Sequence, residues 1–180
     1  MRLALRILFA LVLGIAIGLG VTWLSLRAGI SAFEERIGPW ITSQEFGSAE
    51  ASDRSRAIVA VRGLMALPAS EAIYFNAATD SEGRALDGGC RYRIAGPPLA
   101  ARWWSVTAYG ADAHLISNPD HAYSAGGDGA EAVLAQTGPE PGLGEIATRD
   151  GAPFELTLRA YGPGDGLLDG TLPEIERLSC

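Results

Sequence analysis

The chain opens with an uninterrupted apolar run, and this run constrains everything that follows it. Between Arg6 and Arg27 lie twenty residues, 7–26, without one charged side chain. At about 1.5 Å of rise per residue, a helix of that length matches the roughly 30 Å hydrocarbon core of a bilayer. We therefore expect residues 1–27 to form a single N-terminal transmembrane helix with a short flank, since no second apolar run reaches spanning length.

A cleaved signal peptide is the alternative to a retained anchor. The apolar region of a signal peptide usually runs about 7–15 residues and ends at a small-x-small site. This run is longer, and cleavage after Ala28 would place Leu26 at the −3 position. Cleavage after Ser31 would place Gly29 there, which is a better site. Length favours the anchor, while the Ser31 site keeps cleavage open.

The charges that flank the run predict its orientation. Arg2 and Arg6 precede it, whereas Glu34 and Glu35 follow soon after Arg27. The excess of positive charge before the run places the N-terminus in the cytoplasm and the rest of the chain outside it.

Two glycines give the expected span one small face. Gly14 and Gly18 form a G-x-x-x-G motif, a spacing that lets two helix backbones approach closely. Self-association through this face is one interpretation. The other is that glycine is simply common in membrane helices.

Charge excludes two classes of partner. All fourteen basic residues are arginines, and the part beyond the span has eleven of them against twenty-one acidic residues, a formal charge of −10. A nucleic-acid binder needs a basic surface, and an anionic bilayer would repel an acidic one. We expect no nucleic-acid partner.

The two cysteines, Cys90 and Cys180, both lie beyond the span, where thiols tend to pair. A disulfide between them would close a loop of about ninety residues and add at most roughly 4–5 kcal/mol in the chain-entropy treatment. The alternative is two unpaired thiols. Two cysteines are too few for a structural zinc site, so we expect neither a metal nor a cofactor.

Beyond the span the sequence divides in two. Residues 28–50 are typical of a juxtamembrane connector, because Gly38 and Pro39 interrupt any continuing helix. Residues 51–180 form one domain. It begins with a helix that Ser52 or Asp53 can cap and that Pro68 ends, with its apolar stripe facing the sheet that follows.

After Pro68 the period changes to that of strands. Strands are predicted at residues 71–79, around 90–94, at 102–109 and at 154–161, with weaker candidates at 115–116 and 132–135. Residues 124–129 and 138–144 are predicted loops because they are rich in glycine and proline. Short strands between such turns favour a mainly β antiparallel sandwich with one packed helix.

No established catalytic motif is present: G-x-S-x-G, a P-loop, H-E-x-x-H and G-x-G-x-x-G are all missing. The two histidines lie seven residues apart, close to two aspartates. A site built from Asp112, His114, Asp120 and His121 would make the protein a hydrolase-like envelope enzyme. The alternative is that these are exposed polar loop residues.

Aromatic residues give the strongest local signal. Trp103 and Trp104 are adjacent on one predicted strand, so they point to opposite faces. One belongs to the core, and the other lies on an outer face where it could stack on a sugar ring or planar ligand. The alternative is that both are buried. The candidate ligand-binding residues are Arg91, Trp103, Trp104, Tyr109, Asn118 and Tyr123.

Seven short motifs, taken in order along the chain, together resemble a known family. They are residues 63–67 (GLMAL), 70–80 (SEAIYFNAATD), 83–93 (GRALDGGCRYR), 101–109 (ARWWSVTAY), 115–119 (LISNP), 156–161 (LTLRAY) and 172–180 (LPEIERLSC). In these motifs the chain resembles the bacterial family catalogued as domain of unknown function 1214. The resemblance implies a jelly-roll-like β-sandwich. It also implies kinship with the C-terminal half of two-domain proteins whose other half is domain 1254. It supplies no catalytic residues.

These observations favour a non-enzymatic module held in the bacterial inner membrane by residues 7–26, with its main domain in the periplasm. We expect it to bind an envelope protein, including a separately encoded companion domain, or an envelope carbohydrate. The envelope enzyme described above is the alternative.

Overall fold

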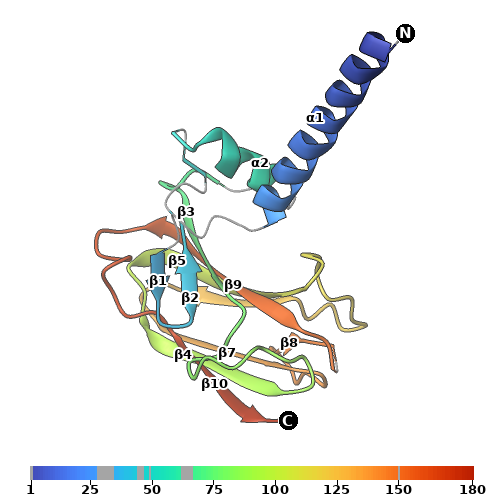
Figure 1. Ribbon diagram of the computed structural model, residues 1–180. Coiled ribbons are helices and arrows are strands. Elements are labelled where there is room, and N and C mark those ends of the chain that lie inside the picture. Colours follow the sequence, from blue (N-terminus) through green and yellow to red (C-terminus); the bar gives the residue numbers. More distant parts are fainter. Residues whose placement is uncertain (1, 28–34, 44–46, 49, 62–66, 150) are drawn as a thin grey trace.

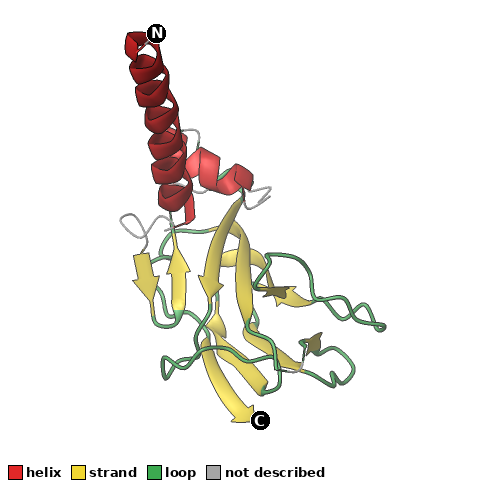
Figure 2. Cartoon of the chain, turned by 45° about the vertical axis from the view of Figure 1, so that its right-hand side comes forward, coloured by secondary structure: helices red, strands yellow, loops and turns green. Residues whose placement is uncertain are grey.

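A computed structural model of the chain describes residues 2–27, 35–43, 47–48, 50–61, 67–149 and 151–180. It is mainly β, as the sequence predicts, with two helices and two sheets. Helix α1 (Arg2–Arg27) projects from one end of the β-rich part, and the C-terminus lies at the opposite end (Figure 1). Figure 2 shows both helices gathered at that one end, with the strands below them.

Helix α1 has the length and composition of a membrane span or a signal sequence. Residues Arg2–Ser25 have a mean hydropathy of 2.5, and none of the most apolar window is buried inside the molecule. Large apolar side chains such as Leu8 and Leu19 are therefore exposed along its length. Among the described residues it is the only helix of this kind.

The first sheet has six antiparallel strands in the order β1-β2-β3-β9-β5-β6. Their bounds are β1 (Glu35–Ile37), β2 (Trp40–Thr42), β3 (Ala72–Ala77), β5 (Ala101–Gly110), β6 (Ser124–Asp128) and β9 (Phe154–Pro163). The two long strands β5 and β9 lie side by side at its centre. Their pairing runs from Ala101 opposite Pro163 to Gly110 opposite Phe154.

The second sheet has four strands in the order β10-β4-β7-β8. Their bounds are β4 (Arg91–Pro98), β7 (Ala132–Gly138), β8 (Ile146–Ala147) and β10 (Glu174–Ser179). The pairs β10–β4 and β4–β7 are antiparallel, and β7–β8 is parallel. The sheet is therefore mixed, and the jelly-roll arrangement of the strands stays a prediction.

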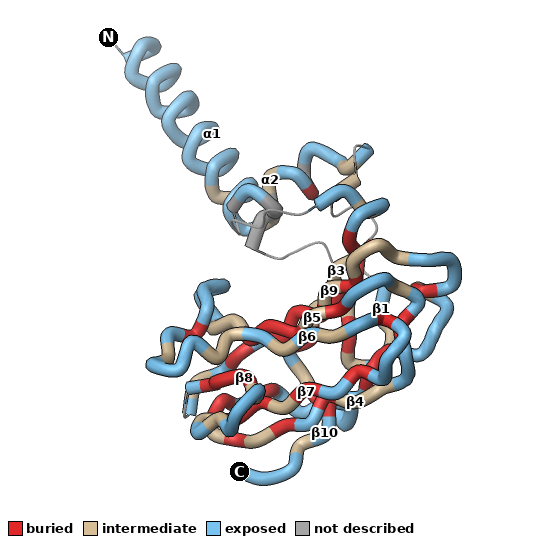
Figure 3. The backbone as a smooth tube through the Cα atoms, turned by 180° about the vertical axis from the view of Figure 1, so that it is seen from behind, coloured by how far each residue is buried: buried red, intermediate tan, exposed pale blue. Residues whose placement is uncertain are grey.

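The two sheets enclose one core. Alternate residues of each strand point inward, because successive side chains of a strand lie on opposite faces. Phe75, Val106 and Leu158 from the first sheet meet Tyr92, Ile94 and Ile175 from the second, and all six are at most 1% exposed. Figure 3 shows the buried stretches of the two sheets facing each other across the sandwich.

The predicted disulfide is present between Cys90 and Cys180, with an S–S distance of 2.06 Å. It fastens the end of β10 to the residue before β4, its neighbouring strand. Cys90 is buried whereas Cys180 is exposed. The bond therefore lies at the rim of the four-stranded sheet.

Helix α2 (Asp53–Val61) begins where the sequence predicts. The backbone N–H of Ser55 donates a 3.2 Å hydrogen bond to the Ser52 hydroxyl, so Ser52 is the N-cap. Helix α2 lies near the base of α1 (Figure 1). The last part of the predicted helix, residues 62–66, lies outside the described residues.

Five strands lie where the sequence indicated none: β1, β2, β6, β8 and β10. Residues 35–42, assigned to the connector, form β1 and β2, and Trp40 is fully buried because the core extends beneath this hairpin. Residues 124–128, a predicted loop, form β6, because pairing with β5 outweighs the low strand propensity of two glycines. Strands β8 and β10 were also not predicted. By contrast, the weak candidate at 115–116 is only a single bridge between Leu115 and Tyr109.

Candidate functional site

The outer face of the six-stranded sheet gathers aromatic and polar side chains from three adjacent strands. Inward residues of β3, β9 and β5 belong to the core, so the residues between them point outward. We call this surface the outer face, and it consists of Tyr74, Asn76, Trp103, Ser105, Thr107, Tyr109, Thr157, Arg159 and Tyr161.

Arg159 lies at the middle of the outer face and is held there by two hydroxyl groups. Its Nη1 donates a 2.9 Å hydrogen bond to Thr107 Oγ1, and its Nη2 donates a 2.6 Å bond to the Tyr109 hydroxyl. Its Cζ also lies 5.6 Å from the centroid of the Tyr109 ring, within cation–π range. The guanidinium is thereby oriented before any ligand arrives.

No carboxylate neutralises this guanidinium within the described part of the chain. The acid-paired arginines there are Arg84, Arg91, Arg93 and Arg177, and Arg159 is not among them. An arginine offers five N–H donors, and the two bonds above use two of them. A half-buried positive charge with three further donors is therefore available at the centre of the face.

A second polar contact orders the neighbouring row. The hydroxyl of Thr157 donates a 2.8 Å hydrogen bond to Asn76 Oδ1, which leaves the Asn76 amide N–H groups for other partners. Thr107 and Thr157 are only 6% and 9% exposed, because larger neighbours flank them. The accessible chemistry of the face therefore resides in its aromatic rings, Asn76 and Arg159.

The adjacent tryptophans point to opposite faces, as predicted, and each lies against a glycine of β6. A Cβ on Gly126 would come within 3.3 Å of the Trp103 indole, and one on Gly127 within 3.0 Å of the Trp104 indole. Trp104 is 3% exposed and donates from Nε1 to the Asp128 carbonyl at 3.1 Å. Trp103 is 47% exposed, so its ring forms a platform on the outer face.

Strand register places this platform beside Arg159. Trp103 is directly opposite Tyr161, and Ser105 is directly opposite Arg159. Trp103 and Arg159 are therefore diagonal neighbours on one face, with Cα atoms roughly 7–8 Å apart, and the Arg159 guanidinium extends from there toward Thr107 and Tyr109. Tyr74 pairs with Arg159 from the other side, in β3.

The structure separates the predicted ligand-binding residues. Trp103 and Tyr109 share the outer face, whereas Trp104 is in the core. Arg91 belongs to the four-stranded sheet, where it binds the Glu145 carboxylate and the Glu140 carbonyl. Asn118 and Tyr123 lie in the β5–β6 connection, and the Asn118 side chain bonds the backbone of its own loop at Ile116 and Ala122.

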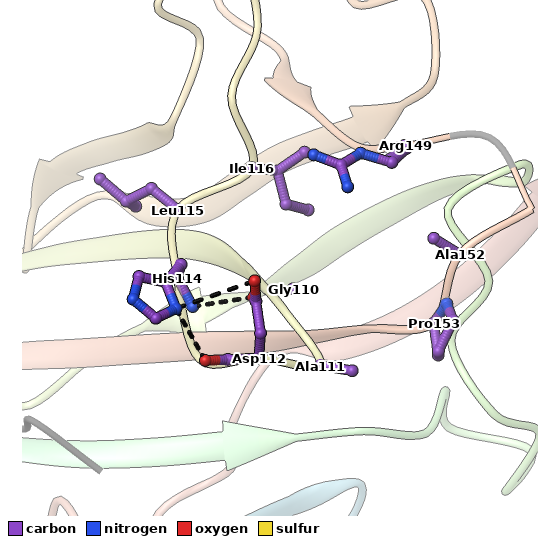
Figure 4. A pocket seen from close by; sticks show the side chains of 9 residues that line it. All are labelled: Gly110, Ala111, Asp112, His114, Leu115, Ile116, Arg149, Ala152 and Pro153. Atoms are coloured by element: carbon purple, nitrogen blue, oxygen red, sulfur yellow. Dashed lines mark hydrogen bonds and ion pairs between the residues drawn. The ribbon is translucent and has the colours of Figure 1, made fainter.

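A pocket of about 240 Å³ lies at the end of β5, between the β5–β6 and β8–β9 connections. Figure 4 shows Asp112 and His114 close together on one side and Arg149 on another. His114 Nδ1 lies 2.8 Å from the Asp112 backbone oxygen and 3.8 Å from Asp112 Oδ2. The two side chains are 74% and 83% exposed, as in a solvated turn.

The other two residues of the predicted hydrolase-like site do not line this pocket. Asp120 and His121 lie further along the same loop, where His121 Nδ1 is 3.3 Å from the Tyr123 hydroxyl. In the described ranges no group of three His, Cys, Asp or Glu residues is arranged to hold a metal ion. The structure therefore brings together one Asp–His pair and not the full set of four.

The carboxyls with shifted pKa lie away from the outer face. Burial alone would raise the pKa of Asp80, but the Arg84 backbone N–H, the Arg84 guanidinium and the Glu82 N–H together lower it below its ordinary value. A hydrogen bond from the Gly142 N–H, with help from Arg91, likewise lowers the pKa of Glu145. Both carboxylates fasten turns, so they serve structure.

Sequence reasoning missed Arg159, Asn76, Tyr74 and Tyr161. The alternation within residues 154–161 did place Arg159 on the polar side of its strand. What the sequence did not show is that this strand lies between β3 and β5, which brings residues fifty or more positions apart onto one surface.

These features define a class: a two-sheet β domain with an apolar N-terminal helix and an aromatic, arginine-centred outer face. The chain belongs to the family described as "Protein of unknown function (DUF1214)", which it matches over residues 71–165. No curated protein matches the chain.

Solved structures include similar chains. The chain is similar to the VPA0106 protein from Vibrio parahaemolyticus, with 25% identity and a TM-score of 0.56, over 72% of this chain and 36% of that one. It is also similar to an uncharacterized protein from Burkholderia cenocepacia, with 17% identity and a TM-score of 0.38, over 60% of this chain and 29% of that one. The chain thus spans about a third of the length of these proteins.

Proposed function

We propose that this protein is a membrane-tethered module of the bacterial envelope that binds a carbohydrate on the outer face of its six-stranded sheet. The observation that carries the proposal is the juxtaposition of the exposed Trp103 ring with the oriented, acid-free guanidinium of Arg159. Helix α1 is the tether, with its N-terminus in the cytoplasm and the β domain in the periplasm.

The chemistry of the outer face suits a sugar better than a nonpolar ligand. A pyranose presents a C–H face, which packs on an indole, and a rim of hydroxyl groups, which need hydrogen-bond partners. Trp103 supplies the first and Arg159 the second, while the Asn76 amide, two strands away on β3, is placed to bind an adjoining sugar. One edge of the Trp103 ring lies close to Gly126 of β6, which restricts the rotamers open to the indole. Rigid aromatic surfaces lose little conformational entropy on binding.

A separately encoded companion domain is the second candidate partner. One specific observation favours it: the matched region covers 36% of the Vibrio parahaemolyticus protein, so that chain has a large part with no counterpart here. Co-purification of a partner protein that protects the outer face would support this candidate over the carbohydrate.

The test is capture of soluble envelope glycans by the full-length protein in detergent, with Trp103→Ala as the variant. We expect the variant to lose at least roughly tenfold in affinity, about 1.4 kcal/mol. Leu134→Ala is the matched control, because Leu134 is also exposed (61%) but lies on the four-stranded sheet. Equal glycan binding by wild type and Trp103→Ala, with unchanged circular dichroism, would rule out this face.

A further inference from the structure

We propose that the carbohydrate bound by the outer face carries isolated carboxylate groups, and that Arg159 binds one of them while Trp103 stacks on the sugar ring. This inference rests on the proposed function and names the chemistry of its ligand. It is drawn from the position, the partners and the charge of Arg159.

The first step concerns the charge of Arg159. A half-buried guanidinium without a carboxylate partner keeps a charge that only solvent or a ligand can neutralise. Two carboxylates border the outer face, Glu155 on β9 and Asp128 on β6, and neither forms an ion pair with Arg159. The Cα atoms of Glu155 and Arg159 are roughly 13 Å apart at the strand rise. The guanidinium extends toward Tyr109, which is directly opposite Glu155, without forming an ion pair there. The cation is therefore open to an external anion.

The second step concerns its orientation. The hydroxyls of Thr107 and Tyr109 accept from Nη1 and Nη2, which fixes the plane of the guanidinium and leaves three N–H donors. The planar fork of arginine matches the two oxygens of a carboxylate. Because the Tyr109 oxygen accepts from Arg159, its own proton is free to donate to the same ligand. The arrangement thus offers donors, as an acidic group requires.

The third step concerns distance. Trp103 and Arg159 are diagonal neighbours whose Cα atoms are roughly 7–8 Å apart, and the guanidinium extends from there toward Thr107 and Tyr109. The carboxyl group that reaches it therefore belongs to a substituent of the sugar stacked on the indole or to the adjoining sugar. Tyr161 lies directly across from Trp103 and extends the platform along the direction between the strands.

The fourth step concerns the spacing of charge along the ligand. The part of the chain beyond the span has a formal charge of −10, so a densely charged polyanion would be repelled. At physiological ionic strength the screening length is about 8 Å, so one carboxylate near Arg159 feels chiefly that guanidinium. A glycan with one carboxylate in each disaccharide satisfies both conditions.

Arg159 also has a structural role that uses its head group, because the guanidinium donates to Thr107 and Tyr109 and lies over the Tyr109 ring. Arg159→Met removes these contacts together with the charge, whereas Arg159→Lys keeps the charge without the planar fork. The informative measurement is therefore the difference in affinity between acidic and reduced glycans, since a structural loss alone would weaken the binding of both forms.

The experiment measures binding of the full-length protein in detergent to three glycans with one carboxylate per disaccharide. They are hyaluronan oligosaccharides, unsulfated heparosan oligosaccharides and peptide-free peptidoglycan strands. Each is paired with its carboxyl-reduced counterpart, which has the same sugars without the charge. We expect at least one acidic glycan to bind at least tenfold more tightly than its reduced form, and this preference to shrink as salt is raised.

The variants separate this inference from the proposed function. Arg159→Met should abolish the acidic preference but leave the weaker binding of the reduced glycan, and Arg159→Lys should restore part of the preference. Trp103→Ala should weaken both forms, and Arg93→Gln, on the other sheet, should change neither. If the wild type bound the acidic and the carboxyl-reduced glycans equally, the inference about the carboxylate would be wrong and the proposed carbohydrate binding would stand. Binding of neither form to any glycan would count against both.

Discussion

The indole Nε1 of Trp40 donates a 2.6 Å hydrogen bond to the backbone carbonyl of Pro173, across 133 positions of the chain. The bond joins the β1–β2 hairpin to the segment that enters β10, and both partners belong to the core between the sheets. The bond therefore ties the N-terminal hairpin of the domain to the segment just before its last strand. Residues 35–43 are part of the folded unit rather than a linker to the membrane.

The first prediction concerns this bond. Trp40→Ala should lower the free energy of unfolding by about 3–5 kcal/mol, because it empties a fully buried site. It also leaves the Pro173 carbonyl without its donor. Urea unfolding followed by tryptophan fluorescence would measure the loss. Ile41→Ala, next in the strand but pointing away from the core and only partly buried, is the control and should cost much less. Comparable losses for the two variants would contradict this role of Trp40.

The second prediction concerns the Cys90–Cys180 disulfide. Because it closes a loop of 90 residues, replacing both cysteines with serine should lower the free energy of unfolding by roughly 2–5 kcal/mol. The measurement is a denaturant titration of wild type and variant under non-reducing conditions. Wild type treated with a reductant should match the untreated variant. If reduction left the wild-type midpoint unchanged, the bond would not contribute to stability.

The third prediction concerns acid. The pKa of Asp80 is lowered in the folded protein because three hydrogen bonds to its carboxylate outweigh the effect of burial. Its stabilisation is therefore fully present above the unfolded pKa of an aspartate, about 3.9, and is lost as pH falls through the lower folded value. Stability measured between pH 6 and 2.5 should fall more steeply in wild type than in Asp80→Asn. Asp165→Asn, an exposed loop residue, should keep the wild-type slope.

The fourth prediction concerns the proposed tether. Alkaline phosphatase fused after Cys180 should be active and green fluorescent protein should be dark, because the proposed orientation puts the β domain outside the cytoplasm. The mass of the purified protein distinguishes an anchor from a cleaved signal: retention of residues 7–26 gives the full-length mass. A shorter soluble product beginning near residue 32 would identify a signal peptide.

Much of the fold follows from local pattern. The strands at 72–77, 91–98, 101–110 and 154–163 alternate buried and exposed residues clearly enough to be recognised without a structure. The disulfide followed from the location of the two cysteines beyond an apolar span. The cap at Ser52 likewise needed only the residues around it.

The remaining strands were not predicted, because each forms only by pairing with a strand that is distant in the sequence or is too short to show a period. Strand β6 (SAGGD) has the composition of a loop, and it forms a strand because its backbone pairs with that of β5. Strands β1 and β2 are three residues long, too short to show a period. The candidate site was not predicted from the sequence either, because it also depends on contacts between distant strands. Its central residue, Arg159, is ordinary in its own strand and acquires its role through Thr107 and Tyr109 on another.

The pairing of two tryptophans with two glycines has an evolutionary consequence. Gly126 and Gly127 leave the space that the Trp103 and Trp104 indoles occupy, one on each side of the sheet. A larger residue in β6 would displace an indole, and a smaller residue in β5 would leave a glycine uncovered. We expect these four positions to covary among relatives, so that a lineage losing Trp103 also gains a side chain at position 126.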